Sequence, residues 1–389
     1  MTGTSLSQTR SKTAHRMVGL DLGTSGIRAA ELRHNRTTNT YEVARVASVE
    51  LPHGAVHNGE FVDIKMVTKA LKKLWKQGRF STRKVTFGIS DSSVITRQLD
   101  LPWMPPADFA QALPYQVNEA LPVETSTVEM DYHLLRQLPG KDSQGQEMTL
   151  NRVLIVASNR DSVTAEAQLI RKSHLIPLAA DSAPFALIRA ACQGKVPHDD
   201  RMRVIADLGS EQLTVIVHQN GQPRFIRTIS NFGGDSATHA IANFLDLSQD
   251  AAEELKKSTG LNGPIQEVAA IPESTVFRSI VTPEQEVLDP ATQATINLLN
   301  PWATTLIKEL RDSIDYFVSS TPGTVISDVT LCGRSTHLAG LQERIATELP
   351  YPVAMMEPLL GLESSNKVSA HPPTDTTYAV AIGLAMGAQ

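Results

Sequence analysis

Short apolar segments occur as two pairs, and a turn of small or polar residues separates the members of each pair. The first pair covers residues 17–22 and 27–32, on either side of the sequence GTSG. The second covers residues 203–208 and 212–217, on either side of GSE. Apolar runs joined by a short glycine-containing turn are typical of β-hairpins. The sequence therefore predicts two β-hairpins, far apart along the chain.

Similar elements follow each predicted hairpin. A third strand over residues 41–51 and a helix over 61–77 come after the first, and the helix carries Lys on its polar face. Another strand and a helix over residues 233–245 come after the second. Apolar spacing of three and four residues also predicts a long amphipathic helix over 302–320. The chain closes on a helix of small residues, 378–388, which must pack closely.

The two hairpins align residue by residue. The four residues from Asp21 to Thr24 (Asp-Leu-Gly-Thr) match those from Asp207 to Ser210 (Asp-Leu-Gly-Ser), and Ile27 matches Leu213. A repeat with matching flanks indicates a duplicated core. At 389 residues the chain also exceeds what one hydrophobic core usually supports. We therefore expect an α/β fold with two lobes.

The segment between the repeats has its own alternation of strands and helices. Two strands surround SDSS, a helix starts at Pro105-Pro106, and two more strands surround PGKDSQGQ before a further helix. We predict a disordered tail over 1–16, lobe one over 17–84 and 181–203, an inserted subdomain over 85–180, and lobe two over 204–389. Lobe two is expected to hold an insertion of its own around 235–300.

Composition narrows the class of protein. The net charge of −5 disfavours a protein that grips nucleic acid. Two distant cysteines favour a reducing compartment, and the eleven histidines show no metal-binding spacing. No stretch approaches the roughly 18 apolar residues of a spanning helix, and the N-terminal tail has no apolar region of a signal peptide. We expect a cytoplasmic protein without a transmembrane segment.

The duplicated turns suit phosphate binding. Small residues let backbone N–H groups approach a phosphate, and hydroxyls add donors. We expect Gly23, Thr24, Ser25 and Gly26 to supply one turn, and Gly209 and Ser210 the other. Asp21 and Asp207, at strand ends, could hold hydrated Mg²⁺. The alternative is that both turns are ordinary hairpin connections; a P-loop and a GxGxxG motif are absent from the sequence.

Three stretches resemble nucleotide-binding motifs of the superfamily of actin, sugar kinases and heat-shock chaperones. GLDLGTSGIRAAEL resembles its phosphate-1 hairpin, DLGSEQLTVIV its phosphate-2 hairpin, and LCGRSTHLAGL its adenosine motif. From residue 17 to the C-terminus the sequence resembles the PilM family of type IV pilus assembly. The resemblance implies an actin-like fold of two ribonuclease-H-like domains with an inserted 1C subdomain. The cell-division family FtsA shares that insertion, but this chain lacks its amphipathic C-terminal helix.

The resemblance also implies further residues of an ATP site. Gly233 and Gly234 match the pair that passes near the nucleotide. Glu253 and Lys256 match residues that reach the ribose, although EELKK also reads as a solvated charged face. Gly333 matches the adenosine motif, whereas Arg334 replaces a glycine that usually lies close to the adenine. A guanidinium there could stack on the base or crowd the pocket.

Two function classes stay open: a nucleotide-binding assembly scaffold and a true kinase or ATPase. Asp181 is the candidate that orients a nucleophile, with a helix N-cap as its alternative role. The resemblance implies binding of the N-terminal peptide of a PilN-like membrane protein, in a groove between lobe one and the insertion. It further implies links to pilus platform proteins and motor ATPases; self-association is another expected interaction. Residues 296–299 (INLL) resemble a PilN motif; they start a helix before Pro301 or fill that groove.

Overall fold

The computed structural model describes residues 15–35, 37–57, 59–89, 94–141, 144–193, 201–263, 288–321, 323–360, 362–364, 371 and 375–387. Of the predicted tail, residues 1–14 lie outside the described part, whereas His15 and Arg16 begin the first strand. Residues 264–287, within the predicted insertion in lobe two, also lie outside it. The first predicted hairpin is confirmed: β1 (His15–Gly23) pairs antiparallel with β2 (Gly26–Asn35). They are central in a sheet of order β10-β6-β1-β2-β3-β16, with β3 (Thr40–Glu50), β6 (Lys84–Ile89), β10 (Ile176–Ser182) and β16 (Glu363–Ser364).

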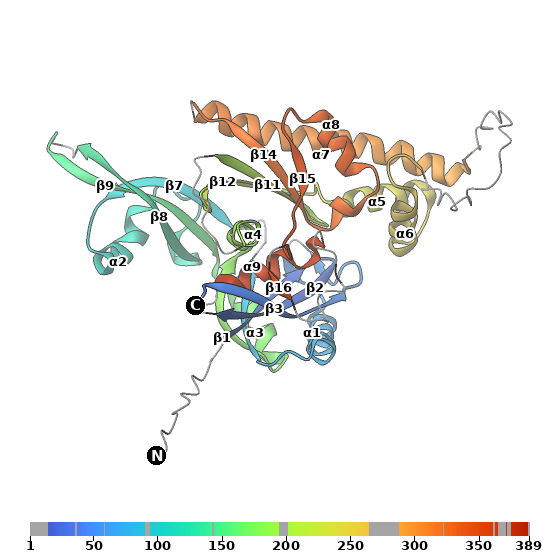
Figure 1. Ribbon diagram of the computed structural model, residues 1–389, viewed down its shortest axis with the longest axis horizontal. Helices are drawn as coiled ribbons and strands as arrows, with labels where there is room; N and C mark the ends of the chain where they lie inside the picture. Colours follow the sequence, from blue (N-terminus) through green and yellow to red (C-terminus); the bar gives the residue numbers. More distant parts are fainter. Residues whose placement is uncertain are drawn as a thin grey trace, which may run out of the picture.

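Helices cover both faces of this sheet (Figure 1). α1 (Ile64–Gly78) and α3 (Arg160–Lys172) pack on one face through a core that includes Val67, Leu71 and Ile170. α4 (Ala183–Ala191) and α9 (Ala379–Gly387) cover the other. The C-terminal helix packs closely, as expected, because a Cβ added to Gly19 of β1 would lie 1.9 Å from the carbonyl oxygen of Ala381.

The second predicted hairpin is confirmed as well, in a second sheet of order β13-β12-β11-β14-β15. Its strands are β11 (Met202–Leu208), β12 (Gln212–Gln219), β13 (Gln222–Ser230), β14 (Ile326–Cys332) and β15 (Val353–Met355). In both sheets three antiparallel strands are followed by a strand parallel to the first, β6 beside β1 and β14 beside β11. This matching topology supports the duplicated core that the repeat predicted.

The helices of the second sheet are α5 (Gly234–Leu245), α6 (Gln249–Thr259), α7 (Pro290–Ser320) and α8 (Leu341–Glu348). α7 begins at Pro290, so the predicted helix start before Pro301 was wrong. The Asp289 carboxylate caps α7 by accepting hydrogen bonds from the backbone N–H groups of Ala291 and Thr292. Residues 296–299 therefore lie inside α7, and the burial of Leu299 in the core excludes them as the occupant of a groove.

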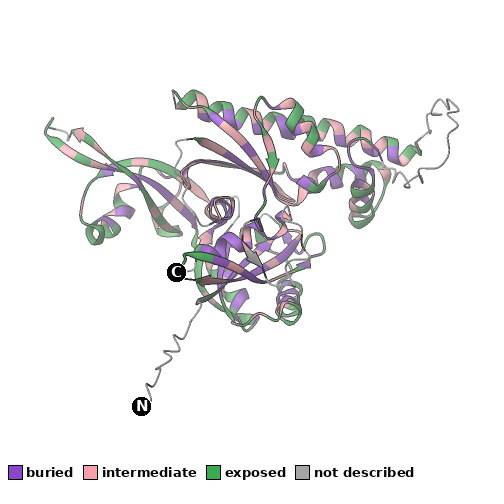
Figure 2. Cartoon of the chain, viewed as in Figure 1, coloured by how far each residue is buried: buried purple, intermediate pink, exposed green. Residues whose placement is uncertain are grey.

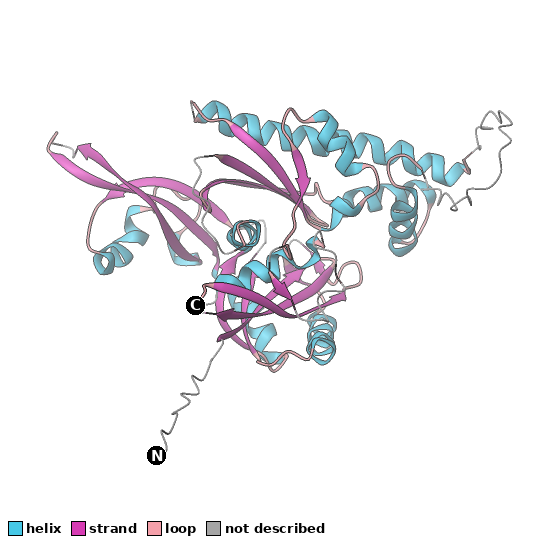
Figure 3. Cartoon of the chain, in the orientation of Figure 1, coloured by secondary structure: helices cyan, strands magenta, loops and turns pink. Residues whose placement is uncertain are grey.

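A third, smaller sheet stands beside the first lobe (Figure 3). It has the order β7-β9-β8, from β7 (Ile95–Pro102), β9 (Glu147–Asn159) and β8 (Val128–Lys141), and packs with α2 (Pro106–Gln116) around Phe109 and Ile155. The strands predicted around SDSS therefore enter different sheets, because β6 pairs with β1 and β10 whereas β7 pairs with β9. The pair β4 (Val56–His57) and β5 (Glu60–Phe61) forms a short separate ribbon.

Burial concentrates in the strands of the two large sheets and in the helices between them (Figure 2). Ile205 and Ile216 of the second sheet share a cluster with Leu187 of α4 and Ala379 of α9. The lobes are thus packed together through α4 and α9, below the cleft where the hairpin turns lie. Within the part of the chain described here, every helix is too short or too polar to cross a bilayer.

Candidate functional site

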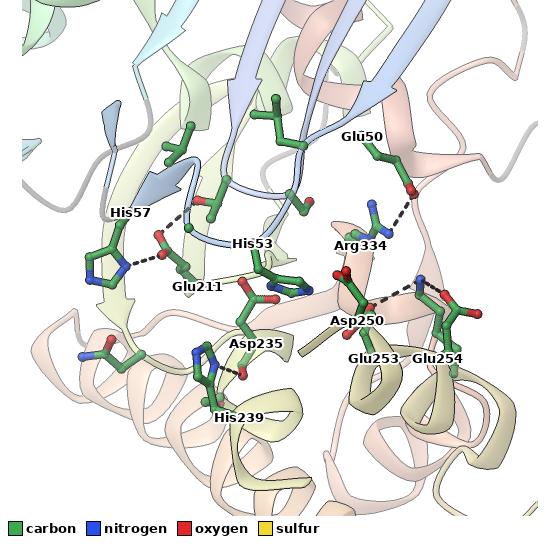
Figure 4. Close-up of a pocket in the computed structure, with 18 residues that line it drawn as sticks. Glu50, His53, His57, Glu211, Asp235, His239, Asp250, Glu253, Glu254 and Arg334 are labelled. Atoms are coloured by element: carbon green, nitrogen blue, oxygen red, sulfur yellow. Dashed lines mark hydrogen bonds and ion pairs between the residues drawn. The ribbon is translucent and has the colours of Figure 1, made fainter. Parts of the chain in front are cut away.

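The two predicted phosphate-binding turns line one cleft between the lobes. The cavity there has a volume of about 590 Å³. Most of the residues predicted from the sequence line it: Asp21, Gly23, Thr24, Ser25, Gly26, Asp207, Gly209, Ser210, Gly234, Glu253, Lys256, Gly333 and Arg334. An adjoining cavity of the same volume extends the cleft past Thr24 and Glu211 to His53 and to His57 of β4 (Figure 4).

Arg28 lies beneath the first turn and was missed by the sequence analysis. It is the cross-strand partner of Asp21 in the hairpin, and its Nη1 lies 3.6 Å from Asp21 Oδ2. Arg28 also donates hydrogen bonds to the Gly26 carbonyl (3.1 Å) and to Ser25 Oγ (3.2 Å). The antiparallel register of the predicted hairpin already places Arg28 opposite Asp21, so this contact could have been predicted from the sequence. This guanidinium adds positive charge to the cradle.

Asp21 and Asp207 belong to opposite lobes, line the same cleft and are only partly exposed to solvent. Burial raises the pKa of Asp21, and the Arg28 cation opposes that rise. Burial, and then the nearby charge of Asp21, raise the pKa of Asp207 to about 6, against the opposing effects of Arg28 and the Cys332 thiol. Two desolvated acids at strand ends are the oxygen donors that a hydrated Mg²⁺ prefers, and a divalent cation would relieve their repulsion. The residues present therefore fit magnesium.

The second turn is supported from behind by the glycine pair. The Gly234 N–H donates to the Gly209 carbonyl (3.1 Å), and the N–H of Asp235 donates to the Ser210 carbonyl (2.8 Å). A Cβ on Gly233 would lie 2.1 Å from the Ser210 oxygen, so a side chain would displace the turn. Gly234 lines the cleft, whereas Gly233 is not among the residues that line it. Gly233 thus shapes the second hairpin turn from outside the cavity.

Glu253 and Lys256 form a buried pair at the wall of the cleft. Lys256 Nζ lies 2.5 Å from Glu253 Oε2 and donates to Thr238 Oγ1 (2.7 Å) and the Gly234 carbonyl (3.0 Å). The Lys256 side chain is only 9% exposed, so the alternative of a solvated charged face was wrong for it. Burial lowers the pKa of Lys256, against the opposing charge of Glu253. For Glu253 burial raises the pKa, but Lys256 and Thr238 together bring it below its usual value.

Residues of the segment 331–341, which resembles the adenosine motif, line the other side of the cleft. Gly333 has φ +89°, and a Cβ there would lie 2.4 Å from Asp207 Oδ1, so glycine fits both the backbone and the space. Arg334 begins the short helix η2 (Arg334–His337) and reaches across to lobe one, where its Nη2 donates to Glu50 Oε1 at 2.9 Å. Arg334 thus makes an ion pair between the lobes at the mouth of the cleft.

Glu211 directly follows the predicted phosphate turn and was also missed. Thr24 Oγ1 of lobe one donates to Glu211 Oε2 at 3.0 Å, and His57 Nδ1 lies 2.8 Å from Glu211 Oε1. The Glu211 side chain is 16% exposed. The Glu211 carboxylate therefore links the two hairpin turns across the cleft. The position of Glu211 beside Ser210 was visible in the sequence, but its partner across the cleft was not.

Asp181 has a different environment from the other predicted residues. It lies near the end of β10 and ion-pairs with Arg189 of α4, whose Nε donates to the Gly383 carbonyl of α9 (2.8 Å). The N-cap position of α4 belongs to Ser182, so the N-cap interpretation of Asp181 was wrong by one residue. Asp181 is not among the residues that line the cleft cavity. Its pair with Arg189 joins β10, α4 and α9, and its role in orienting a nucleophile stays a prediction.

Comparison with known proteins decides the family. The family described as "Type IV pilus assembly protein PilM" matches residues 19–270 and 289–389. The chain belongs to the PilM family. Membership in PilM settles the choice between the pilus and cell-division families that the sequence left open.

Solved structures agree with this assignment at the level of the fold. A structure of a "PilM-PilN type IV pilus biogenesis complex" is 22% identical, covers 96% of this chain and 98% of its own, and superposes with a TM-score of 0.76. The ethanolamine utilization protein EutJ from Carboxydothermus hydrogenoformans is 13% identical, with coverages of 96% and 89% and a TM-score of 0.51. A diol dehydratase-reactivating factor in nucleotide-free form is 12% identical, with coverages of 96% and 99% and a TM-score of 0.50. This PilM family member therefore has the actin-like two-lobed fold with an inserted subdomain.

Proposed function

We propose that this actin-like protein of type IV pilus assembly is a cytoplasmic scaffold that binds ATP with Mg²⁺. In this proposal it is held at the inner face of the membrane by the N-terminal peptide of a PilN-like protein. Through that membrane partner it connects to platform proteins and motor ATPases, and it self-associates. Family membership supports the assembly role; the nucleotide and the peptide each rest on separate features of the structure.

The observation that carries nucleotide binding is that Asp21 and Asp207 line one cleft together with the two glycine turns. The turns offer backbone N–H groups and the hydroxyls of Thr24, Ser25 and Ser210, and Arg28 adds a cation. Asp21 and Asp207 would hold the hydrated Mg²⁺, which would neutralise phosphate charge. Lys256 and Glu253 would contact the nucleoside end, as the family resemblance implies.

We propose an inserted subdomain narrower than the predicted 85–180, because β6, α3 and β10 lie within or against the sheet around β1. Lobe one then contains the sheet around β1, lobe two the sheet around β11, and the inserted subdomain the sheet of β7, β8 and β9. Residues 194–200, just before the predicted start of lobe two, and 264–287, within its predicted insertion, lie outside the described part of the chain. The insertion adjoins lobe one, because β8 and β9 contact α3 and the ring of His133 on β8 lies near that of Phe185 on α4.

The groove between lobe one and the insertion is the proposed peptide site. Ile176 and Leu178 lie on β10, the edge strand of the first sheet, and both side chains are exposed. Leu134 is exposed on β8, an edge strand of the small sheet, and its neighbour His133 lies with its ring 6.4 Å from that of Phe185 on α4. An unpaired strand edge with apolar side chains suits capture of an extended peptide.

The peptide site is tested with a fluorescent peptide copied from the N-terminus of the PilN-like protein of the same bacterium. Fluorescence anisotropy measures its affinity for the full chain and for Leu178→Asp, which we expect to bind at least tenfold more weakly. Val325→Asp is the control, because Val325 is 78% exposed in the loop before β14 of lobe two. Equal binding by both variants, or none by the native chain, would count against the proposed site.

The alternative function is a kinase or ATPase of the same fold. Phosphoryl transfer needs a group that orients the nucleophile, and Asp181, the residue predicted for it, is engaged by Arg189. We therefore favour the scaffold, in which the nucleotide sets the angle between the lobes. Steady-state phosphate release separates the two: several turnovers per minute with ATP and a small-molecule acceptor would favour the enzyme.

A further inference from the structure

Glu211 occupies a place in the cleft that the proposed nucleotide site also needs. Its carboxylate accepts the hydroxyl hydrogen of Thr24, which belongs to the first phosphate turn, while Glu211 itself extends the second. A phosphoryl oxygen held between the two turns would accept the same hydrogen bond. Carboxylate and phosphate oxygens are both anionic acceptors, so Glu211 and a phosphate compete for this donor.

The location of Glu211 singles out one phosphate of the nucleotide. Figure 4 shows Glu211 and His57 on one side of the pocket, and Arg334, Glu253 and Glu254 on the opposite side. Glu253, a proposed nucleoside contact, belongs to that opposite side. A phosphate chain running from there reaches Glu211 last. The competing group is therefore the terminal phosphate.

The charges around Glu211 reinforce this competition. The Asp235 carboxylate lies in the same pocket, and its pKa is raised by burial and then by Glu253 and Glu211, while Lys256 and His53 oppose the rise. Because Glu211 is largely screened from water, a further negative charge beside it is repelled more strongly than it would be in solvent. The additional phosphate of a triphosphate meets this repulsion, whereas the shorter chain of a diphosphate stops before it.

We infer that Glu211 is a specificity-determining residue that makes the cleft prefer a nucleoside diphosphate to a triphosphate. A triphosphate binds fully only after Glu211 releases Thr24, and that release also removes a hydrogen bond between the lobes. The inference rests on the proposed nucleotide site and adds to it the preference for the number of phosphates.

The test compares ADP and ATP, each with Mg²⁺, by isothermal titration calorimetry on the full chain. In the native chain we expect ADP to bind more tightly than ATP. Glu211→Gln keeps the size and an acceptor for Thr24 but removes the charge, so the ratio of Kd for ATP to Kd for ADP should fall by about tenfold. The control is Glu254→Gln, which neutralises an exposed carboxylate of the same pocket that does not contact Thr24.

A second variant keeps the inference testable if Glu211→Gln does not fold. Glu211→Ser removes the carboxylate altogether and should lower the ratio at least as far, with circular dichroism and thermal melting confirming that each variant folds. An unchanged ratio in both variants, or a weaker binding of ATP than in the native chain, would overturn the inference while leaving the nucleotide site standing. Failure of ADP and ATP to bind any of the proteins would overturn both proposals.

Discussion

Glu50 at the end of β3 and Arg334 at the start of η2 form an ion pair of 2.9 Å that joins the two lobes across the mouth of the cleft. Arg334 occupies the place where the family resemblance implies a second glycine. The pair therefore stands at the entrance of the proposed nucleotide site, and it forms only when the lobes are close together.

Breaking this pair should change the rate of nucleotide binding more than stability. Glu50 is mostly exposed, and such ion pairs contribute under about 1 kcal/mol. We expect Arg334→Gly to leave the melting temperature almost unchanged and to raise the association rate of a fluorescent ATP analogue several-fold in stopped-flow measurements. Glu50→Gln breaks the same pair and should act in the same direction. Unchanged association rates in both variants would show that the pair does not restrict access.

Asp207 should destabilise the nucleotide-free protein as pH rises. Its pKa is raised to about 6 in the folded chain from 3.8, so the folded state binds the proton more tightly and stability falls between about pH 4 and pH 6. Asp207→Asn removes this penalty, and we expect about 2–3 kcal/mol of added stability at pH 8, with a smaller gain at pH 5. Urea unfolding at both pH values measures the difference.

The matched control for this experiment is Asp312→Asn, a surface carboxylate on α7 that pairs with Lys308. We expect its effect on stability to be small, because surface ion pairs contribute under about 1 kcal/mol. A gain in Asp207→Asn that did not grow with pH would contradict the account of two repelling, desolvated carboxylates.

The buried pair of Glu253 and Lys256 should behave as a unit. Removing one partner leaves the other buried without its counter-charge, which costs about 3–5 kcal/mol. We expect Lys256→Met to lower the free energy of unfolding by an amount in or slightly below this range. The double variant with Glu253→Gln should lose less than the sum of the two single variants, as measured by a double-mutant cycle in urea. Additive losses would show that the two side chains are not coupled.

Gly19 tests the close packing of the C-terminal helix. Because a Cβ there would lie 1.9 Å from the Ala381 backbone oxygen, we expect Gly19→Ala to lower the free energy of unfolding by several kcal/mol. Gly54→Ala is the comparison: its φ of +79° is strained for alanine, but no atom lies within 4 Å, so its cost should be about 1 kcal/mol. Similar melting temperatures for the two variants would show that α9 does not pack closely against β1 at Gly19.

Local pattern and the repeat accounted for much of the fold. Both hairpins follow from strand periodicity around Gly23 and Gly209, and their duplication predicted two lobes. The start of α7 was misplaced because Pro301 was read as a helix boundary, whereas Asp289 and Pro290 provide the cap and the first turn. The pattern also could not show that β6 and β7, close in sequence, belong to different sheets, since strand pairing depends on distant segments.

Site residues that lie within one hairpin turn were predicted from the sequence, whereas contacts between side chains across the cleft were not. Thr24 and Ser210 were found from their own hairpins. To predict Arg28, the antiparallel register of the first hairpin had to be followed, and the sequence implied that register. The contacts of Glu211 with Thr24 and of Arg334 with Glu50 depend on how the two lobes face each other. The sequence of a single turn does not indicate that arrangement.

The central claim is that the cleft between the two hairpin turns binds a nucleotide, and calorimetric titration of ADP with Mg²⁺ into the full chain tests it most directly. We expect one site per chain, and a loss of at least about a hundredfold in affinity in Gly209→Val, whose side chain would fill the approach to the second turn. The nearest atom to a Cβ there is the Gln212 oxygen at 3.1 Å, so the variant should still fold, which thermal melting checks. Absence of binding by the native chain, or equal affinity in a folded Gly209→Val variant, would contradict the account.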